Sequence, residues 1–364
     1  MNQERINRVL QALEEMNVSQ MLITDSMSIY YLTDVLIHPG ERFLGLYLRQ
    51  DGEHVFFLNK LFVLPKEVQI QKVWYSDTDD LTKIIAQHLD KENVLGVDKD
   101  LKARFLLPLM EQEAATGFVN ASYAVDITRA CKDEAEREKM REASRINDKA
   151  MEEFKKLIRE GVTEKEVANQ LLKIYKNLGA EGFSFTPIVS FGKNAADPHH
   201  MPDDTVLKEG DCVLFDVGCV KDGYCSDMTR TFYYKSVTEH QKQVYEIVRM
   251  ANEAAEKKIK PGVAICELDN TARNLISEAG YGPQFTHRLG HFIGLEVHEY
   301  GDVSEANQWE AMPGMTFSIE PGIYLTGDTG VRIEDLVLVT KEGCEILNHY
   351  SKELEIIGER KDLT

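Results

Sequence analysis

Up to about residue 125, short apolar runs alternate with segments in which apolar residues have helical spacing. The chain starts with MNQERINRVLQALEEMNVSQ, whose apolar side chains recur as on one face of a helix. Helical spacing returns in LTKIIAQHL. Runs typical of strands are MLITD, FLGLYLRQ and HVFFLN, the last two around an Asp51-Gly52 turn, followed by VQIQKVWY and NVLGVD. The alternation predicts a compact α/β domain over residues 1–126.

The pattern changes near residue 127. There, ITRACKDEAEREKMREASRINDKAMEEFKKLIREG predicts one long charged amphipathic helix, with acids at its start and Gly161 at its end. A boundary just before this helix gives a second domain over residues 127–364. Thr163 and Glu166 predict a capping box for the next helix, TEKEVANQLLKIYKNL. Later helix pairs alternate with antiparallel hairpins, which predicts an α+β domain with a curved antiparallel sheet and helices outside it.

The strongest turn signal in the second domain is Asp222-Gly223, which lies between DCVLFDVGCV and YCSDMTRTFYY. A two-residue turn there places Asp227 opposite Gly218 in an antiparallel hairpin. Asp216 projects from the same face, because it lies two residues before Gly218. The two aspartates then become diagonal neighbours, about 7 to 8 Å apart at Cα. The hairpin is therefore expected to bring two carboxylates together.

Composition and charge narrow the classes of function. The 364 residues carry a formal charge of -19, which disfavours a nucleic-acid partner because phosphate binding needs a basic face. The N-terminus has acids where a signal peptide has a basic start, and no run approaches about 18 apolar residues. We therefore expect a cytoplasmic protein with no membrane association. The six cysteines form no C-x-x-C pair, which favours reduced, mostly buried thiols over a zinc site.

Several acids stand in strand segments where the pattern favours apolar residues. They are Asp216, Asp227, Glu320 and Glu334. An ionised carboxylate on a buried sheet face costs several kcal/mol unless a cation compensates it. Each acid alone could cap a turn or pair with an arginine. Together with His291, which lies among glycines, they form the ligand set of a two-metal site. Oxygen ligands with one imidazole favour Mn²⁺, Co²⁺, Fe²⁺ or Zn²⁺ over thiolate-bound zinc.

Five motifs follow one another in the second domain. They are LFDVG, SDMTRTF, HRLGHFIGLEVHE, SIEPGIY and GVRIED. In order and spacing they resemble the pita-bread metallopeptidases, which include Xaa-Pro dipeptidase (prolidase), aminopeptidase P and, more distantly, methionine aminopeptidase. The segment INRVLQALEEMNVSQMLITDSMSIYYLTDV resembles the creatinase-like N-terminal domain of prolidases. The resemblance thus covers the whole chain and is strongest for the short bacterial Xaa-Pro dipeptidases. It implies a creatinase-like α/β domain followed by a pita-bread catalytic domain.

The resemblance also implies roles for the matching positions. The implied metal ligands are Asp216, Asp227, His291, Glu320 and Glu334. Asp227 and Glu334 are expected to contact both ions. His199 and His298 match substrate-contacting histidines, Glu320 is expected to take the proton of the attacking water, and Arg332 is expected to orient Glu320 or the ligand shell. His200 matches no family residue and is expected to be a surface neighbour. Phe292, where relatives often carry glycine, is expected to narrow a pocket wall.

Substrate selectivity is expected to depend on residues outside the metal cluster. Arg288 stands where short bacterial prolidases carry an arginine that binds the substrate carboxylate. The segment HPGERFLGL resembles a prolidase loop that reaches a neighbouring subunit's active site, with His38, Glu41 and Arg42 as its polar tips. The alternatives are that Arg288 is a surface cation and that residues 38–42 form an ordinary turn.

The expected function is hydrolysis of Xaa-Pro dipeptides by a homodimer with two divalent ions, Mn²⁺ first among them. A hydroxide shared by the ions would attack the carbonyl before proline. The alternative is aminopeptidase P, which releases the N-terminal residue from longer Xaa-Pro peptides. A peptide-binding module without catalysis is a third class, and the intact ligand set disfavours it.

Overall fold

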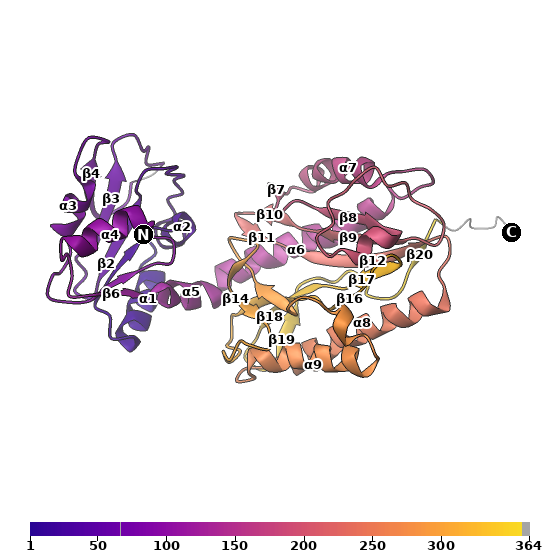
Figure 1. Cartoon of the computed structure of the whole chain (residues 1–364). Helices are drawn as coiled ribbons and strands as arrows, with labels where there is room; N and C mark the ends of the chain where they lie inside the picture. The colour runs from indigo at the N-terminus through magenta and orange to yellow at the C-terminus, as the bar shows by residue number, and fades with distance from the viewer. Residues whose placement is uncertain (66, 359–364) are drawn as a thin grey trace. The chain divides into compact units, whose positions relative to one another are not determined.

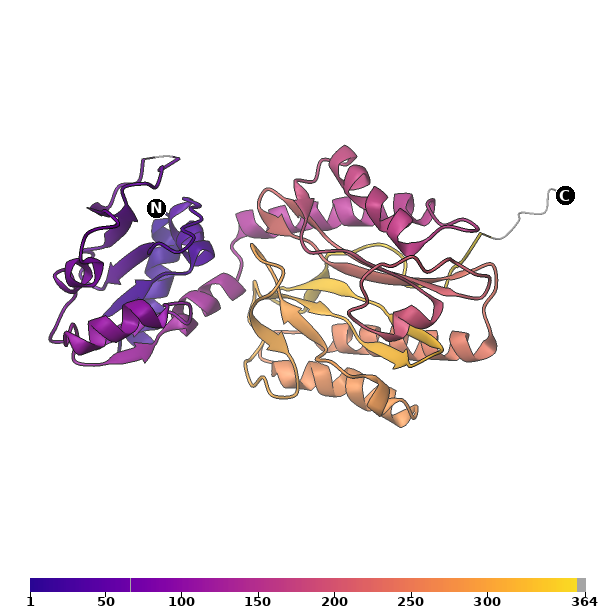
Figure 2. The same cartoon turned by 45° about the horizontal axis from the view of Figure 1, so that its top comes forward.

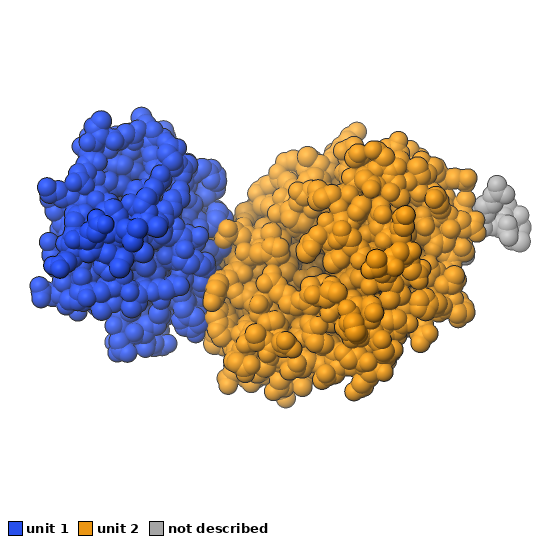
Figure 3. Space-filling view, viewed as in Figure 1, with its two compact units in different colours: residues 1–129 blue, residues 130–364 orange. Residues whose placement is uncertain are grey.

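The computed structural model describes residues 1–65 and 67–358. It divides into two compact units, Met1–Arg129 and Ala130–Thr364, shown in different colours in Figure 3. Within the described part of the chain, no helix is long and apolar enough to cross a membrane. All of the expected metal ligands belong to the second unit.

The first unit is built on a six-stranded mixed sheet with the strand order β4-β3-β2-β1-β5-β6 (Figure 1). β1 pairs antiparallel with β2 and parallel with β5. Leu22, Phe57 and Leu95 from these strands are fully buried in the core. The predicted α/β domain is confirmed. The strands are β1 Gln20–Ile23, β2 Gly45–Arg49, β3 Val55–Asn59, β4 Gln71–Tyr75, β5 Leu95–Val97 and β6 Phe118–Asn120, and the helices are α1 Gln3–Glu15, α2 Ser26–Thr33, α3 Leu81–Ala86 and α4 Ala103–Glu111.

The single long helix predicted from residue 127 to Gly161 is wrong. The segment holds two helices, α5 (Ser122–Ala130) and α6 (Glu134–Lys155). Asp133 separates them, because its carboxylate accepts the backbone N–H of Glu136 while the Glu136 side chain accepts that of Asp133. This capping box starts a new helix inside the charged segment. The capping box predicted at Thr163 is confirmed at the start of α7 (Glu164–Asn177).

Helices enclose the strands of the second unit. Figures 1 and 2 show α6 and α7 along one flank of the strands, and α8 (Glu239–Lys258) and α9 (Ile265–Glu278) along the other. Phe154 of α6 packs against Tyr175 of α7 and Phe215 of β9, with ring centroids 5.1 and 6.1 Å away. The short helices η1 (Gly192–Ala196) and η2 (Gly282–Gln284) connect these elements. The strands are β7 Gly182–Phe183, β8 Ile188–Phe191, β9 Cys212–Val217, β10 Cys219–Lys221, β11 Tyr224–Cys225, β12 Met228–Tyr234, β13 Gly290–Phe292, β14 Glu299–Val303, β15 Thr316–Ile319, β16 Gly322–Leu325, β17 Thr329–Arg332, β18 Asp335–Val339, β19 Cys344–Ile346 and β20 Ile356–Ile357.

The first long hairpin of this unit has the predicted register. Val217 pairs with Met228 in the β9–β12 ladder and Val220 pairs with Cys225 at the tip, which puts Gly218 opposite Asp227. Asp222 and Gly223 both have positive φ, 49° and 78°, as a two-residue type I′ turn requires. The ladder is interrupted at Gly218, where a Cβ atom would lie 2.1 Å from the Ser226 carbonyl oxygen. Only glycine allows the strands to approach so closely.

The second long hairpin combines two pairs of strands. Ile319 pairs with Asp335 in the β15–β18 ladder, and Gly322 pairs with Arg332 in the β16–β17 ladder, so the second ladder continues the register of the first. The interruption falls at residues 320–321 on one side and 333–334 on the other. Glu320 and Glu334 therefore lie opposite each other where the ladder breaks.

Candidate metal centre and active site

Nine of the predicted site residues meet in one cavity. Its volume is about 460 Å³ and its walls carry acids, histidines and two arginines. The four acids come from the two interrupted hairpins, and His291 comes from β13 between them. The lining residues are Phe185, Ile188, Pro198, His199, Asp216, Asp227, His287, Arg288, His291, Val297, His298, Glu320, Arg332 and Glu334.

Ligand atoms crowd the floor of this cavity. One oxygen each of Asp227 and Glu334 and one ring nitrogen of His291 all lie within 4.8 Å of one another, and all three residues are buried. His291 Nε2 lies 3.6 Å from Asp227 Oδ2 and 3.6 Å from Glu320 Oε1. Asp227 Oδ1 is buried and accepts no hydrogen bond from the residues that the structure describes. A buried carboxylate oxygen without a donor is costly unless a cation binds it.

The protonation of the cluster follows from burial and mutual repulsion. Burial, and then the charge of Asp216, raises the pKa of Asp227 well above its ordinary value. Burial, and then the charge of Asp227, does the same to the pKa of Glu334. Burial raises the pKa of Glu320 to about 7. Without cations, burial and mutual repulsion favour the protonated forms of these carboxyls, and divalent ions would replace the protons. The residues therefore fit a metal centre.

Arg332 orients the ligand shell through Asp216. Its Nη2 donates to Asp216 Oδ2 at 2.6 Å, and its Nε donates to Thr229 Oγ1 at 3.2 Å. The Thr229 hydroxyl in turn donates to Glu334 Oε2 at 2.8 Å. One buried guanidinium thus fixes two ligands directly or through Thr229.

A chain of hydrogen bonds leads from Arg332 to a histidine to which the sequence analysis gave no role. Arg332 Nη1 donates to the Tyr324 hydroxyl at 2.9 Å, and this oxygen lies 2.7 Å from His287 Nε2. His287 Nδ1 lies 2.7 Å from the Arg288 carbonyl oxygen, which can only accept. Nδ1 therefore carries the proton, and Nε2 accepts from Tyr324. His287 stands four residues before His291 in the HRLGH motif, and this even spacing could have indicated it.

Two histidines that line the cavity, His287 and His298, favour the neutral form. Burial lowers the pKa values of both His287 and His298 to about 4. The His298 ring packs edge-on against His291, with ring centroids 4.3 Å apart. As a neutral imidazole, His298 can donate one N–H to a substrate carbonyl oxygen without adding positive charge beside the metal ligands, whereas the N–H of His287 is already used by the Arg288 carbonyl.

Comparison with known proteins follows this division into two units. The model of metallopeptidase family M24 matches residues 138–341, and that of the creatinase/prolidase N-terminal domain matches residues 5–131. The chain belongs to metallopeptidase family M24. The M24 and creatinase matches confirm the predicted fold class, a creatinase-like α/β domain followed by a pita-bread domain.

Relatives of this M24 peptidase match nearly its whole length. An uncharacterised peptidase of Staphylococcus aureus is 38% identical over 96% of this chain and 99% of its own. The dipeptidase PepE of Mycobacterium ulcerans has a TM-score of 0.91 and 30% identity, over 98% of this chain and 97% of its own. A Xaa-Pro dipeptidase from Bacillus anthracis has a TM-score of 0.87 and 32% identity, over 98% and 99% of the two chains.

Two expectations about residues beside the site are wrong in this M24 peptidase. His200 is not a surface neighbour: its side chain is 15% exposed, and its Nε2 lies 2.7 Å from the buried Glu164 carboxylate. Phe292 does not narrow the cavity. It is fully buried and packs against Phe317 and Trp309, on the side of β13 away from the ligands. Neighbouring residues of a strand point to opposite faces, so Phe292 faces the core because His291 faces the cavity.

The loop that carries His38, Glu41 and Arg42, which are expected to bind substrate, lies in the first unit. There Arg42 makes a bidentate pair with Asp77, at 2.9 and 2.7 Å, and also lies 3.0 Å from Glu41. The roles of His38, Glu41 and Arg42 in a neighbouring subunit's site stay predictions. In the second unit, Arg288 is partly exposed at the cavity rim, 3.8 Å from Asp302.

Proposed function

We propose that this M24 peptidase hydrolyses Xaa-Pro dipeptides with two divalent cations bound to Asp216, Asp227, His291, Glu320 and Glu334. The observation that carries the proposal is the cavity, which brings these five ligands together with His199, His298 and Arg288. Similarity over nearly the whole chain to a Xaa-Pro dipeptidase from Bacillus anthracis supports it.

The charge of the carboxylates and the missing hydrogen-bond donor at Asp227 both favour cations at the base of the cavity. Four carboxylates offer negative charge that two divalent ions would neutralise, and Asp227 Oδ1 has no donor among the described residues. Asp227 and Glu334 would help to hold these cations. When bound, the cations would supply an activated water and polarise the peptide carbonyl. Mn²⁺ is our first choice, and Co²⁺, Zn²⁺ and Fe²⁺ suit the same ligands.

The side chains around the cluster would position the substrate and move the proton. Glu320 would accept the proton of the attacking water and deliver it to the prolyl nitrogen as the bond breaks. The imidazoles of His298 and His199 would donate to the carbonyl oxygen while negative charge develops on it. Arg332 would hold Asp216 in place throughout. The apolar walls at Phe185 and Ile188 suit a proline ring.

Arg288 would bind the carboxylate that ends a dipeptide at proline. Its guanidinium is partly exposed and its only described ion pair, with Asp302 at 3.8 Å, is long enough to give way to a substrate. His38, Glu41 and Arg42 of a second subunit would close the same end of the site in a cytoplasmic homodimer.

One observation favours aminopeptidase P as the second candidate. A further cavity of about 420 Å³ adjoins the first and shares Arg288 and His298 with it. Tyr300, Asp302 and Trp309 line this space, which could hold residues that follow proline. Peptides longer than two residues would then be accepted.

The test is hydrolysis of Met-Pro and of Met-Pro-Ala by metal-stripped protein resupplied with Mn²⁺, Co²⁺ or Zn²⁺. We expect metal-dependent cleavage of Met-Pro and little of the tripeptide, with His291→Ala inactive toward both. Strong cleavage of Met-Pro-Ala would establish the aminopeptidase P alternative. If the metal-loaded protein cleaved neither peptide, a peptide-binding module without catalysis would replace both proposals.

A further inference from the structure

The break in the second long hairpin leaves a backbone acceptor without its donor. In the continued register, Pro321 stands opposite Ile333, and the Ile333 N–H donates to the Pro321 carbonyl at 3.4 Å. The reciprocal bond cannot form, because proline has no N–H. The Ile333 carbonyl oxygen therefore needs another donor. This acceptor immediately precedes the ligand Glu334, and Pro321 immediately follows the ligand Glu320.

Asn252 of α8 supplies that donor. Its Nδ2 donates to the carbonyl oxygen of Ile319 at 2.9 Å and to that of Ile333 at 3.4 Å. Asn252 is fully buried. One amide group thus joins the residue before Glu320 to the residue before Glu334, across the gap where the strands no longer hold each other.

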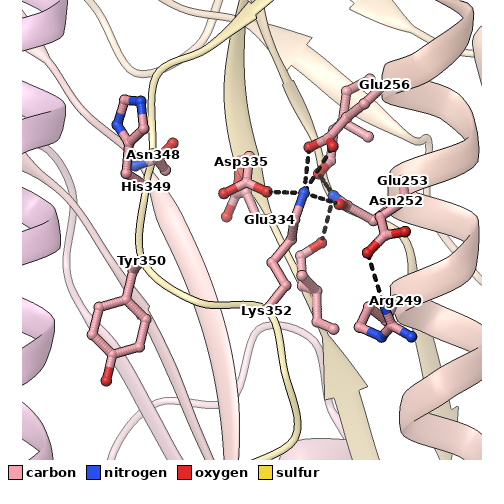
Figure 4. Close-up of polar contacts among 12 residues, drawn as sticks. Arg249, Asn252, Glu253, Glu256, Glu334, Asp335, Asn348, His349, Tyr350 and Lys352 are labelled. Carbon is pink, nitrogen blue, oxygen red and sulfur yellow. Dashed lines mark hydrogen bonds and ion pairs between the residues drawn. The ribbon is translucent and has the colours of Figure 1, made fainter.

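Lys352 fixes the direction in which this amide points. Its ammonium group donates to Asn252 Oδ1 at 2.8 Å. An ammonium group can only donate, so the oxygen of the amide faces Lys352 and the nitrogen faces the two carbonyls. Figure 4 shows Lys352 between Asp335 on one side and Glu256 and Asn252 on the other. The ammonium lies 2.9 Å from Asp335 Oδ2 and 2.7 Å from Glu256 Oε2.

A second cation completes the network on the other side of Asp335. Arg230 Nη2 donates to Asp335 Oδ1 at 2.6 Å, and Arg230 Nη1 donates to the Glu334 carbonyl at 2.6 Å. Two cations thus face the two carboxyl groups of Asp335 and Glu256 in this buried network. It holds the backbone of Glu334 directly through Arg230 and indirectly through Asn252.

We propose that Lys352 and Asn252 are positioning residues, which set the separation of Glu320 and Glu334 and thereby the affinity for metal. This inference rests on the metal centre of the proposed function. Neither residue lines the cavity, and Lys352 comes from the segment after β19, outside every motif of the ligand set. Loss of such outer partners typically weakens metal binding by about 10- to 100-fold.

A merely structural role for Lys352 is the competing explanation, and Lys155 gives a matched control. Lys155 of α6 also pairs with the C-terminal segment, through Glu355 at 2.8 Å. The two lysine side chains are similarly buried, 17% exposed for Lys352 and 21% for Lys155. Lys155 has no described bond to the strands that carry Glu320 or Glu334.

The test titrates Mn²⁺ into the metal-stripped full chain by calorimetry, with circular dichroism to verify folding. We expect Lys352→Met to bind Mn²⁺ about 10- to 100-fold more weakly than the wild type. Lys352→Arg should recover most of the affinity, since it can still donate to Asn252. Lys155→Met should lower the midpoint of thermal unfolding and leave the affinity unchanged.

Asn252→Asp decides the question if Lys352→Met does not fold. Its carboxylate has the same shape and still accepts from Lys352, but it cannot donate to the two carbonyls. We expect the same loss of Mn²⁺ affinity. Lys352→Met, or Asn252→Asp in its place, binding Mn²⁺ as tightly as Lys155→Met would overturn the inference alone. A wild-type chain that binds none of Mn²⁺, Co²⁺, Zn²⁺ and Fe²⁺ would overturn the proposed function as well.

Discussion

Among the described residues of the second unit, two groups of acids and histidine are compact enough to hold a cation, and only one of them has the features of a metal site. Glu164, His200 and Asp203 form the first group, and Asp227, His291 and Glu334 form the second. In the first group, Glu164 accepts from the backbone N–H groups of Phe191 and Asp203 and from the Asn194 amide, and it pairs with His200. In the second, Asp227 Oδ1 has no donor among the described residues. Proximity of ligand types is common to both groups, so the unsatisfied oxygen is what distinguishes a metal centre.

The difference comes from the backbone around each group. Glu164 accepts the backbone N–H of Phe191, at the end of β8, and that of Asp203, in the loop that also carries His199 and His200. Asp227 and Glu334 lie at the ends of strands, where the neighbouring N–H groups are used in the ladders. Asp227 Oδ1 therefore has no backbone donor among the described residues. This arrangement leaves the oxygens available to cations.

Replacing a ligand should give the largest effect. We expect Asp227→Asn to lower both Mn²⁺ affinity and hydrolysis of Met-Pro by more than about 100-fold, because a ligand matters more than the outer partners whose loss costs that much. The metal-free variant should unfold at a higher temperature than the metal-free wild type, since one of the mutually repelling carboxyls has gone. Elemental analysis, activity assays and calorimetry measure the three effects. Equal metal content in both proteins would contradict the assignment.

Replacing Glu164, the central residue of the other group, should lower the stability of the fold and leave the metal content unchanged. Glu164→Ala leaves His200 and several buried donors without an acceptor, so we expect a loss of about 3 kcal/mol in the free energy of unfolding. Urea unfolding measures the loss, and elemental analysis should find the same metal content as in the wild type. A variant that keeps its stability but loses a metal ion would mean that Glu164 is a ligand.

The pH dependence of metal stabilisation should separate the two groups further. Burial raises the pKa of Glu320 to about 7, so the protonated carboxyl stabilises the metal-free fold fully below the unfolded value. That stabilisation is lost as the pH rises from about 4.3 through about 7. Mn²⁺ replaces the proton, and the rise in unfolding temperature on adding Mn²⁺ should be larger at about pH 8 than at about pH 5.5. Thermal scans at both pH values, with His291→Ala as the control, test this. An increment that shrinks with rising pH would contradict it.

The smallest effect is expected at His287. Burial lowers its pKa to about 4, so the neutral ring stabilises the fold above the unfolded value, and this is lost as the pH falls from about 6.5 to about 4. In His287→Asn this contribution, on the order of 2 kcal/mol, should disappear. Urea unfolding between these pH values measures it. A variant with an undiminished pH slope would place the titration elsewhere.

The turn and strand patterns in the sequence correctly predicted the hairpin that carries Asp216 and Asp227. The Asp222-Gly223 turn fixed the hairpin register, and the structure has Gly218 opposite Asp227 as expected. Of the four acids expected in strands, Asp216 lies within β9, whereas Asp227, Glu320 and Glu334 lie just beyond the ends of strands. Alternation did not exclude Phe292 from the cavity until the direction of His291 was known. The break before α6 was missed because Asp133 lies within a continuous charged pattern and its capping role depends on its own φ and ψ.

Contacts between distant segments could not be predicted from patterns. Nothing near Asn252 or Lys352 indicates a partner, because α8 and the C-terminal segment meet only once the sheets have formed between the helices. The contact between His200 and Glu164 could not be predicted for the same reason, since α7, β7, β8 and η1 lie between the two residues. Around Glu164 the sequence predicted only the capping box at Thr163, because a capping box depends on residues close together in the chain.

The proline in the second hairpin has an evolutionary consequence. A mutation that replaces Pro321 by a residue with an N–H would restore the missing ladder bond to Ile333 and make one of the two tasks of Asn252 redundant. A mutation of Asn252 alone would leave the Ile333 carbonyl oxygen without this donor. The two positions are therefore epistatic, and a lineage can lose the proline before the asparagine more easily than in the reverse order.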